Sequence, residues 1–494
     1  MNKKLIIVIA AAILYLLWHI LTLSYYPLPW FDETYFASIS LDFIQHGTFV
    51  PQVAYHAREG REALTYGPVY FFLTGLSQKL FGLGILQFRI VNLLFGFLCI
   101  LVSLKIIGSK ELGFTAILFL GIFALDPFFN LCMHEGRMDL TALFFALLSL
   151  YFVLKDGGKH IFYSAISASF ALMTTPRSAI VIFGVVMILL MNAYKDNKYK
   201  PLVQWSFTLL ALYALWLFYA FGDPLQYLDY YKALQNNENQ VNHDFLGGRF
   251  YIPRQEYVLI SVAVFSVVFN FIKKKIDFPD LLSSVSIAVI LLFYVIVLDW
   301  GPYSALIIPF YYILIFNKDE FTWSFSNPKL YMLMILLTHN VSYFTIKSAH
   351  IISSMQQRDP ALADKFVTGH IPAGSKVVGD ALYFYAVKKS GSDYQFFDKY
   401  ASLEIREQRH REDYNYDYII ITDQSLKREP EAVAIYLENS RFKKVAELNI
   451  APSVLNQKIS ALGLVSNTEN SGYNAVIYLR IKDREQLPMA ILSK

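Results

Sequence analysis

The stretch LIIVIAAAILYLLWHILTL, residues 5 to 23, determines the fold class. It contains no carboxylate, lysine or arginine, and about 20 such residues are enough to cross a bilayer core as a helix. Lys3 and Lys4 precede it, but the stretch is longer than the apolar core of a signal peptide and no small-residue cleavage site follows. We therefore predict a retained first transmembrane helix whose N-terminus lies in the cytoplasm.

The rest of the chain extends this prediction. Hydrophobic residues make up 55% of the 494 residues and charged residues only 17%, which is too apolar for a soluble chain of this length. An α-helical polytopic membrane protein with about eleven spans is expected. The further spans are predicted near residues 85–107, 112–130, 138–154, 161–173, 177–193, 203–221, 256–272, 281–299, 303–316 and 329–346.

The distribution of lysine predicts which loops are cytoplasmic. With the N-terminus inside, the cytoplasmic loops read GSKE, LKDGGKH, YKDNKYK, KKKID and NKDE, and each carries lysine, as the bias of basic residues toward the cytoplasm requires. The opposite loops carry most of the acids and arginines. An odd number of spans places residues 347–494 outside as well.

The C-terminal part has a different composition. Short β-rich stretches (SKVVGD, DYIIIT, KKVAEL and AVIYLRI) alternate with helix-like stretches such as PEAVAIYLEN. We expect a transmembrane domain over 1–346 and a small soluble α/β domain over 347–494. The net charge of +4 gives no indication of nucleic-acid binding, and two cysteines, Cys99 and Cys132, do not make a disulfide framework.

The first outer loop is too long and too patterned to be a simple connector. From Glu33, apolar residues recur at helical spacing up to Gly47, which is a suitable end for a helix. A second helix is predicted from Pro68 to Phe81, with proline at its start and Gly82 at its end. Both are expected to lie at the membrane surface.

An acidic pair, Asp32 and Glu33, lies between the first span and the first of these helices. One interpretation is structural: Asp32 is a helix N-cap and Glu33 favours the positive end of the helix. The other is functional, with a carboxylate held at the level of the lipid headgroups. The second outer loop favours the functional interpretation, because HEGRMD places Arg137 and Asp139 at the outer mouth of a span, and ionisable groups there are costly.

These segments resemble the polytopic C-type-fold glycosyltransferases that use polyprenyl-phosphate sugars, which include the aminoarabinose transferases acting on lipid A and the protein O-mannosyltransferases. The resemblance lies in FDETYFASISLDFIQHG, YGPVYFFLTGLSQKLFGLGILQFRIVNLLFG and GRMD, and in ADKFVTGHIPAGSKVVGD at 363–380. Their order, spacing and predicted side of the membrane carry it together.

The resemblance implies an activity and its partners. A sugar would move with inversion from a polyprenyl-phosphate donor to a hydroxyl of an acceptor lipid, glycan or protein, at the periplasmic face of a bacterial inner membrane. It implies that Asp32 is the base, that Glu33 orients the acceptor and that Asp139 supports the same pocket. A phosphate leaving group needs cations more than an acid.

Arginine suits the donor phosphate because its planar fork makes paired hydrogen bonds to phosphate oxygens. Arg137 and Arg89 are the first candidates. Arg58, Arg61 and Arg177 are further candidates, each with the alternative of an ordinary solvated or headgroup-contacting arginine. The aminoarabinose branch has a lysine just before a Pro-Pro pair, whereas this chain reads Tyr66-Gly67-Pro68, so Tyr66 stands in that part of the predicted site without the lysine's charge.

Other functions remain open. His134 with Glu135, and His243 with Asp244, could ligate a divalent cation, but two-residue clusters have little specificity and no cofactor is predicted. A secondary transporter would also have many spans and buried charges, usually with repeats and charges near mid-membrane. A non-catalytic membrane scaffold would leave Asp32 and Asp139 without a role.

Overall fold

The computed structural model describes most of the chain. The described residues are 3–53, 66–108, 113–155, 160–223, 225–228, 256–272, 281–296, 302–316, 327–397, 416–428, 430, 433–434, 442–462 and 472–481. The chain forms two compact units: Met1–Ile20, Ala63–Ser77 and Phe88–Lys347 make unit 1, and Leu21–Glu62, Gln78–Gln87 and Ser348–Lys494 make unit 2.

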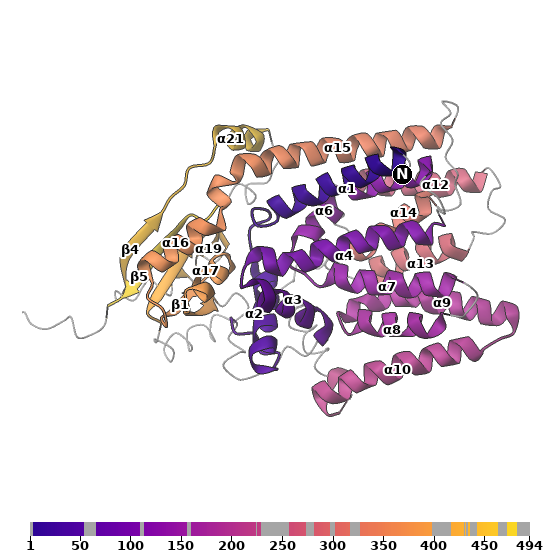
Figure 1. Ribbon diagram of the computed structural model, residues 1–494, viewed down its shortest axis with the longest axis horizontal. Helices are drawn as coiled ribbons and strands as arrows, with labels where there is room; N and C mark the ends of the chain where they lie inside the picture. The colour runs from indigo at the N-terminus through magenta and orange to yellow at the C-terminus, as the bar shows by residue number, and fades with distance from the viewer. Residues whose placement is uncertain are drawn as a thin grey trace, which may run out of the picture. The chain divides into compact units, whose positions relative to one another are not determined.

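Unit 1 is helical (Figure 1). Its helices are α1 (Lys3–Thr22), α4 (Ile85–Ile106), α5 (Phe114–Ala124), α6 (Pro127–His134), α7 (Asp139–Leu154), α8 (Ile161–Leu172), η3 (Pro176–Ser178), α9 (Ala179–Asp196), α10 (Lys200–Phe221), α12 (Tyr257–Ile272), α13 (Leu281–Ile296), η5 (Pro302–Leu306), α14 (Ile308–Phe316) and α15 (Pro328–Ser354). Helices α1, α3, α4 and α15 each continue from one unit into the other.

Helix α7 lies at the centre of the packing in this unit. It contacts α8 and α9 along its length, and it also contacts the short helices η3 and η5. Helix α10 packs on α8, α9 packs on α13, and α14 contacts both α12 and α13 (Figure 1). Ten of the sixteen residues of α7 are buried, among them Asp139 at its first position.

Several helices have the length and composition of membrane spans. Three described helices are long and apolar enough to cross a bilayer: Ile85–Ile106, Pro176–Asp196 and Lys200–Phe221. Helices α1, α7, α8, α12, α13 and α14 are apolar but shorter. Each predicted span therefore coincides with helix, while the predicted number of about eleven spans stays a prediction.

The predicted span 112–130 differs from a single helix. Helix α5 ends at Ala124, α6 begins at Pro127, and the axes of the two helices differ by 60°. Asp126 and Pro127 explain the break, because proline disfavours helical geometry in the residue before it and lacks an N–H. The Asp126 carboxylate caps α6 by accepting a hydrogen bond from the backbone N of Phe129 at 2.8 Å.

The two helices predicted in the first outer loop are present. Helix α2 covers Phe31–His46 and ends at Gly47, whose φ of 76° is left-handed. Helix α3 covers Pro68–Phe81, and Gly82 follows with φ of 88°. Glycine adopts this conformation without a steric cost, which explains both ends. Whether these helices lie at a membrane surface stays a prediction.

The C-terminal part of unit 2 is a five-stranded mixed sheet in the order β2-β1-β3-β5-β4. Strands β1 (Lys376–Gly379), β2 (Asp393–Phe396) and β3 (Tyr418–Thr422) are parallel, whereas β5 (Ala475–Arg480) pairs antiparallel with β3 and with β4 (Phe442–Leu448). The helices of this part are η6 (Gln356–Arg358), α16 (Pro360–His370), η7 (Ala381–Tyr383), α17 (Phe384–Lys389), α19 (Asp423–Arg428) and α21 (Val454–Ala461).

The predicted α/β character of this part is confirmed. The four β-rich stretches of the sequence form β1, β3, β4 and β5. Strand β2 was not predicted. Most of the helix-like stretch PEAVAIYLEN lies outside the described residues. The helix predicted over 329–346 continues to Ser354.

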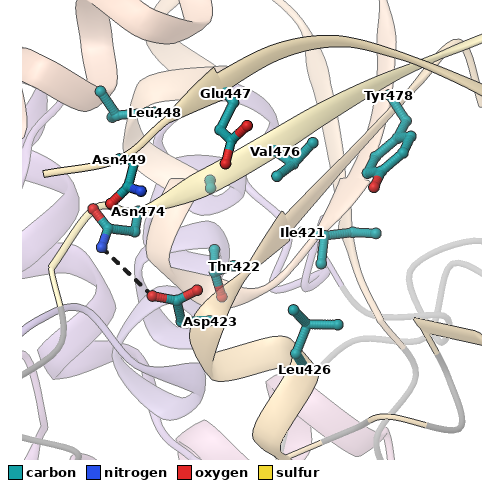
Figure 2. A pocket seen from close by; sticks show the side chains of 11 residues that line it. Ile421, Thr422, Asp423, Leu426, Glu447, Leu448, Asn449, Asn474, Val476 and Tyr478 are labelled. Atoms are coloured by element: carbon teal, nitrogen blue, oxygen red, sulfur yellow. Dashed lines mark hydrogen bonds between the residues drawn. The ribbon is translucent and has the colours of Figure 1, made fainter.

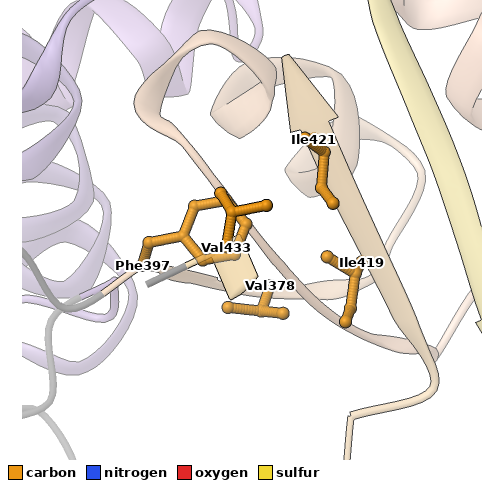
Figure 3. Close-up of a cluster of buried hydrophobic side chains, with 5 residues drawn as sticks. All are labelled: Val378, Phe397, Ile419, Ile421 and Val433. Carbon is orange, nitrogen blue, oxygen red and sulfur yellow. The ribbon is translucent and has the colours of Figure 1, made fainter. Parts of the chain in front are cut away.

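One face of the sheet carries a compact apolar cluster. Val378 from β1, Ile419 and Ile421 from β3, Phe397 and Val433 form it (Figure 3). The β3 residues are two apart, so both side chains point to the same face. Helix α2 also belongs to unit 2: the Phe31 ring lies 5.3 Å from the Phe396 ring, and the Phe396 N–H donates to the Val53 carbonyl at 2.9 Å. The N-terminal end of α2 and the segment at Val53 are thus anchored on the sheet.

We expect Gly379→Ala to destabilise unit 2. A Cβ there would lie 2.5 Å from the Tyr394 hydroxyl and 2.9 Å from the Ile420 carbonyl oxygen, so a backbone atom would have to move. The expected loss is about 2 kcal/mol of unfolding free energy, as for overpacking. Thermal unfolding of the full chain in detergent measures it, with Gly369→Ala as control, because a Cβ at Gly369 meets nothing within 4 Å. Equal melting temperatures for the two variants would contradict the prediction.

Candidate functional site

The acidic pair lies in the first turn of α2, within unit 2. The N-cap of α2 is Trp30, and it makes no side-chain cap hydrogen bond. The structural interpretation of Asp32 as an N-cap is therefore wrong. Both carboxylates still favour the positive end of the helix.

The two carboxylates differ in burial. Glu33 is fully buried, whereas Asp32 is partly exposed. A buried carboxylate must be held by partners inside the protein, because transfer from water without them is costly. Of the pair, Asp32 is therefore the one whose exposure suits direct contact with a substrate.

In unit 1, the predicted residues Arg137 and Asp139 form a buried ion pair. The Arg137 Nε donates to Asp139 Oδ2 at 2.9 Å, and each side chain is only 4% exposed. Asp139 Oδ1 has no hydrogen-bond partner among the described residues. Burying two charges is favourable only when their geometry is good, so this pair fixes the orientation of the guanidinium.

Tyr303 joins a second predicted arginine to this pair. The Arg177 guanidinium lies 3.8 Å from the centre of the Tyr303 ring, and the Arg137 guanidinium lies 4.8 Å from it. Tyr303 belongs to η5, Arg177 to η3 and Arg137 to the α6–α7 connection, and both short helices contact α7. Three segments far apart in sequence thus bring two cations to one aromatic ring, which cation–π attraction stabilises.

Helix α4 holds the backbone of the same connection. The Asn92 side-chain amide donates to the carbonyl oxygens of Glu135 and Arg137. Arg89, one turn earlier on the same helix, is fully buried. Asn92 and Tyr303 were not predicted as site residues. Asn92 follows Arg89 at helical spacing and Tyr303 is the first residue of the predicted span 303–316, which were the available signals.

Tyr66 precedes Gly67, which lies against Met173 at the C-terminal end of α8. A Cβ at Gly67 would lie 2.0 Å from the carbonyl oxygen of Met173, so only glycine permits this approach of two backbones. The Val69 N–H lies 3.4 Å from the same oxygen and donates to it. Tyr66 is partly exposed. The segment before α3 is therefore held against a residue four positions before Arg177.

Several predicted residues cannot be placed. Arg58, Arg61, His243 and Asp244 lie outside the described residues. His134 is buried, and its Nε2 lies 2.6 Å from His19 Nδ1. Among the described residues, no group of three or more His, Cys, Asp or Glu side chains could hold a metal ion. His134 therefore pairs with another histidine within the helices of unit 1.

A buried polar network that the sequence did not predict surrounds the break between α5 and α6. The Tyr312 hydroxyl donates to Asp126 Oδ2 at 2.9 Å, and the Asn340 amide donates to the Ile122 carbonyl at 2.9 Å. The Tyr15 hydroxyl donates to Asn130 Oδ1 at 2.5 Å. The pair Asp126-Pro127 inside an apolar stretch was the signal for it. The network satisfies polar groups that a helix break leaves without partners.

The architecture of the two units defines the class of fold. The chain has the fold of a multi-pass membrane protein, and its second unit combines helix α2 with a C-terminal α/β part. No protein-family model matches the chain, and no curated protein matches its sequence.

Two crystal structures of ArnT from Cupriavidus metallidurans have this fold. The apo structure is 12% identical, has a TM-score of 0.55, and the match covers 96% of this chain and 97% of that chain. The structure bound to undecaprenyl phosphate is 12% identical, has a TM-score of 0.56, and the match covers 98% and 99%. The resemblance seen in the sequence is thus confirmed at the level of the fold.

We expect Asp139→Asn to destabilise unit 1. The substitution removes the charge of one partner of the buried Arg137 guanidinium, and the loss of a partner from a buried ion pair costs about 3 kcal/mol of unfolding free energy. The control is Asp393→Asn, which breaks the pair of Asp393 with Lys388, in which the Asp393 side chain is 57% exposed. Exposed pairs contribute at most about 1 kcal/mol. Thermal unfolding in detergent compares the two, and an equal or larger loss for Asp393→Asn would contradict the prediction.

Proposed function

We propose that this protein is a membrane glycosyltransferase that moves a sugar from a polyprenyl-phosphate donor to an acceptor hydroxyl. One observation carries the proposal: the chain shares its fold, over nearly its whole length, with ArnT, an aminoarabinose transferase that binds undecaprenyl phosphate. The cluster of Arg137, Arg177 and Tyr303 supports it independently, because it concentrates fixed positive charge at one end of a helical membrane unit.

In this proposal Arg137 and Arg177 bind the phosphate of the donor. Their guanidinium groups are oriented before the donor arrives, Arg137 by Asp139 and both by the Tyr303 ring. Preorganised cations stabilise the charge that develops on the departing phosphate without a reorganisation cost. Arg89, Arg58 and Arg61 remain further proposed phosphate ligands, and Tyr66 remains a proposed substrate contact.

Asp32 is the proposed base. It accepts the proton of the acceptor hydroxyl as the oxygen attacks the anomeric carbon opposite the phosphate, which gives inversion. Bond formation to the acceptor and cleavage of the sugar–phosphate bond release the polyprenyl phosphate. Glu33 orients the acceptor and Asp139 positions Arg137. The proposed setting is a bacterial inner membrane, with the site and the C-terminal domain in the periplasm and the N-terminus in the cytoplasm. The proposed domain boundary lies between 346 and 347.

One observation favours a second candidate function, a secondary transporter. Transporters often use broken helices near their substrate sites, and α5 and α6 form such a break around the buried Asp126. The two functions differ in a simple way. A transporter moves a substrate without releasing polyprenyl phosphate, so the product of the first assay below distinguishes them.

Asp32→Asn tests the proposed base. The assay measures release of free polyprenyl phosphate from a panel of labelled polyprenyl-phosphate sugars in membranes with crude acceptor. We expect the wild type to consume one donor and the variant to release about 100-fold less, because general bases contribute about that much or more. The control is Asp393→Asn, an exposed carboxylate of β2. Equal turnover by wild type and Asp32→Asn would reject Asp32, and no turnover of any donor would reject the transferase.

Arg137→Lys and Arg177→Lys test the phosphate contacts. Lysine keeps the charge but loses the planar fork and much of the contact with the Tyr303 ring, so the KM for the donor is expected to rise about tenfold in each variant. Arg480→Lys, at the end of β5, is the matched control. A raised KM in the control, or unchanged KM values in both variants, would contradict the assignment.

A further inference from the structure

The C-terminal sheet carries a cavity that the proposed transferase chemistry does not use. Its volume is about 240 Å³, and it lies over strands β3, β5 and β4 beside α19 (Figure 2). Strand β5 runs through its middle, since β5 pairs with both of its neighbours. The lining residues are Ile421, Thr422, Asp423, Leu426, Glu447, Leu448, Asn449, Asn474, Ala475, Val476 and Tyr478.

One end of the cavity is polar, and its side chains are held in place. Asn474 donates from Nδ2 to Asp423 Oδ2 at 3.5 Å and accepts at Oδ1 from the Ile450 N–H at 2.8 Å. Asn449 lies next to Asn474 in Figure 2. The bond from the Ile450 N–H fixes the orientation of the Asn474 amide, and the longer contact places this amide beside the Asp423 carboxylate. An incoming hydroxyl would therefore meet donors and acceptors that are already oriented, which lowers the entropic cost of binding.

Glu447 adds a second carboxylate above this end. It accepts a hydrogen bond from Lys444, and that bond raises the pKa of the exposed Lys444 ammonium. Lys444 does not line the cavity. None of the described residues that line it is a lysine, an arginine or a histidine. An anionic ligand would meet the Asp423 carboxylate and the Glu447 carboxylate, which is paired with Lys444, and no cation among the described lining residues, so the lining disfavours phosphate and carboxylate groups.

The remaining wall is apolar and ends in an aromatic ring. Ile421 of β3 is paired in register with Val476 of β5, and Tyr478 follows two residues later on the same face. Figure 2 shows the Tyr478 ring at the end of the cavity away from Asp423 and Asn474. Tyr478 also packs against the apolar cluster around Ile419 and Val378. The ring is thus supported from within the domain.

We propose that this cavity binds a single uncharged sugar ring. A sugar ring has a hydroxyl-bearing edge, which suits paired carboxylate and amide groups, and a C–H face, which suits an apolar wall with a ring. The volume is below the roughly 300 Å³ at which pockets for drug-sized ligands begin, which fits one ring. The proposal goes beyond the transferase function, because binding here needs neither donor nor turnover.

Ligand-observed saturation-transfer NMR tests the proposal on the full chain in a detergent without a sugar headgroup. The probes are the methyl glycosides of glucose, galactose, mannose, N-acetylglucosamine and arabinose, added without a lipid donor. The variants are Asp423→Asn and Asn449→Ala, both at exposed positions, and the control is Asp364→Asn, whose pair with Lys389 lies on α16 and α17. Melting temperatures verify that all variants are folded.

We expect saturable transfer to at least one glycoside, about tenfold weaker binding in both cavity variants and unchanged binding in the control, since each variant removes or weakens hydrogen bonds to the ring. No saturable transfer to any glycoside would overturn the proposal. Binding that is equal in wild type and both cavity variants would also overturn it, because the sugar would then bind elsewhere. Binding of Ca²⁺ alone, lost in Asp423→Asn and without any glycoside signal, would identify a cation site instead.

Discussion

The buried ion pair between Arg137 and Asp139 is the interaction on which the candidate site of unit 1 depends. Each side chain is only 4% exposed, and the attraction between the two charges offsets part of the cost of burying them. The pair joins the connection after α6 to the first turn of α7, and Asn92 of α4 holds the carbonyls on either side of Gly136. The four residues 135–138 between α6 and α7 are thereby held by Asn92, Asp139 and Tyr303.

The fixed positions of Arg137 and Arg177 lower the entropic cost of binding an anion. A guanidinium that must first be ordered loses part of its binding energy to entropy, whereas one already held by a carboxylate and an aromatic ring does not. Tyr303 contacts both Arg137 and Arg177, so the spacing of the two cations is set by one ring. In the proposed reaction Asp139 thus acts on the arginine, and the partly exposed Asp32 of α2 is the carboxylate that meets the acceptor.

The sequence predicted the elements whose signals are local. Helices at 31–46 and 68–81 were expected from helical periodicity, from proline at the start of one and from glycine after each, and these signals act within a few residues. Four of the five strands were expected for the same reason. Strand β2 was missed because DYQF becomes a strand through pairing with β1, a contact that the local sequence does not contain.

The candidate site was predicted less completely, because its geometry depends on contacts between distant segments. Arg137, Asp139 and Arg177 were expected from charge in outer loops, but nothing in the sequence distinguishes Tyr303 from the other aromatic residues of such loops. The break at Asp126 was also missed: apolar residues on both sides of Asp126-Pro127 give the appearance of one span. The Asp126 carboxylate is accommodated by the Phe129 N–H and by the Tyr312 hydroxyl, and Asn340 in turn donates to that hydroxyl; Tyr312 and Asn340 come from two later helices.

Tyr66-Gly67-Pro68 shows how a departure from a family pattern can be compatible with the same chemistry. Gly67 lies against the Met173 carbonyl so closely that no side chain fits, and this approach holds the segment beside the start of η3. The lysine that the aminoarabinose branch carries before its prolines is absent, but Arg177 enters the chain four residues after Met173. If the ligand is a lipid phosphate, its charge can be met by arginines fixed on Tyr303 in place of a lysine on the loop. The positive charge at the proposed phosphate site then comes from Arg137 before α7 and Arg177 in η3, and it does not require a lysine at position 66.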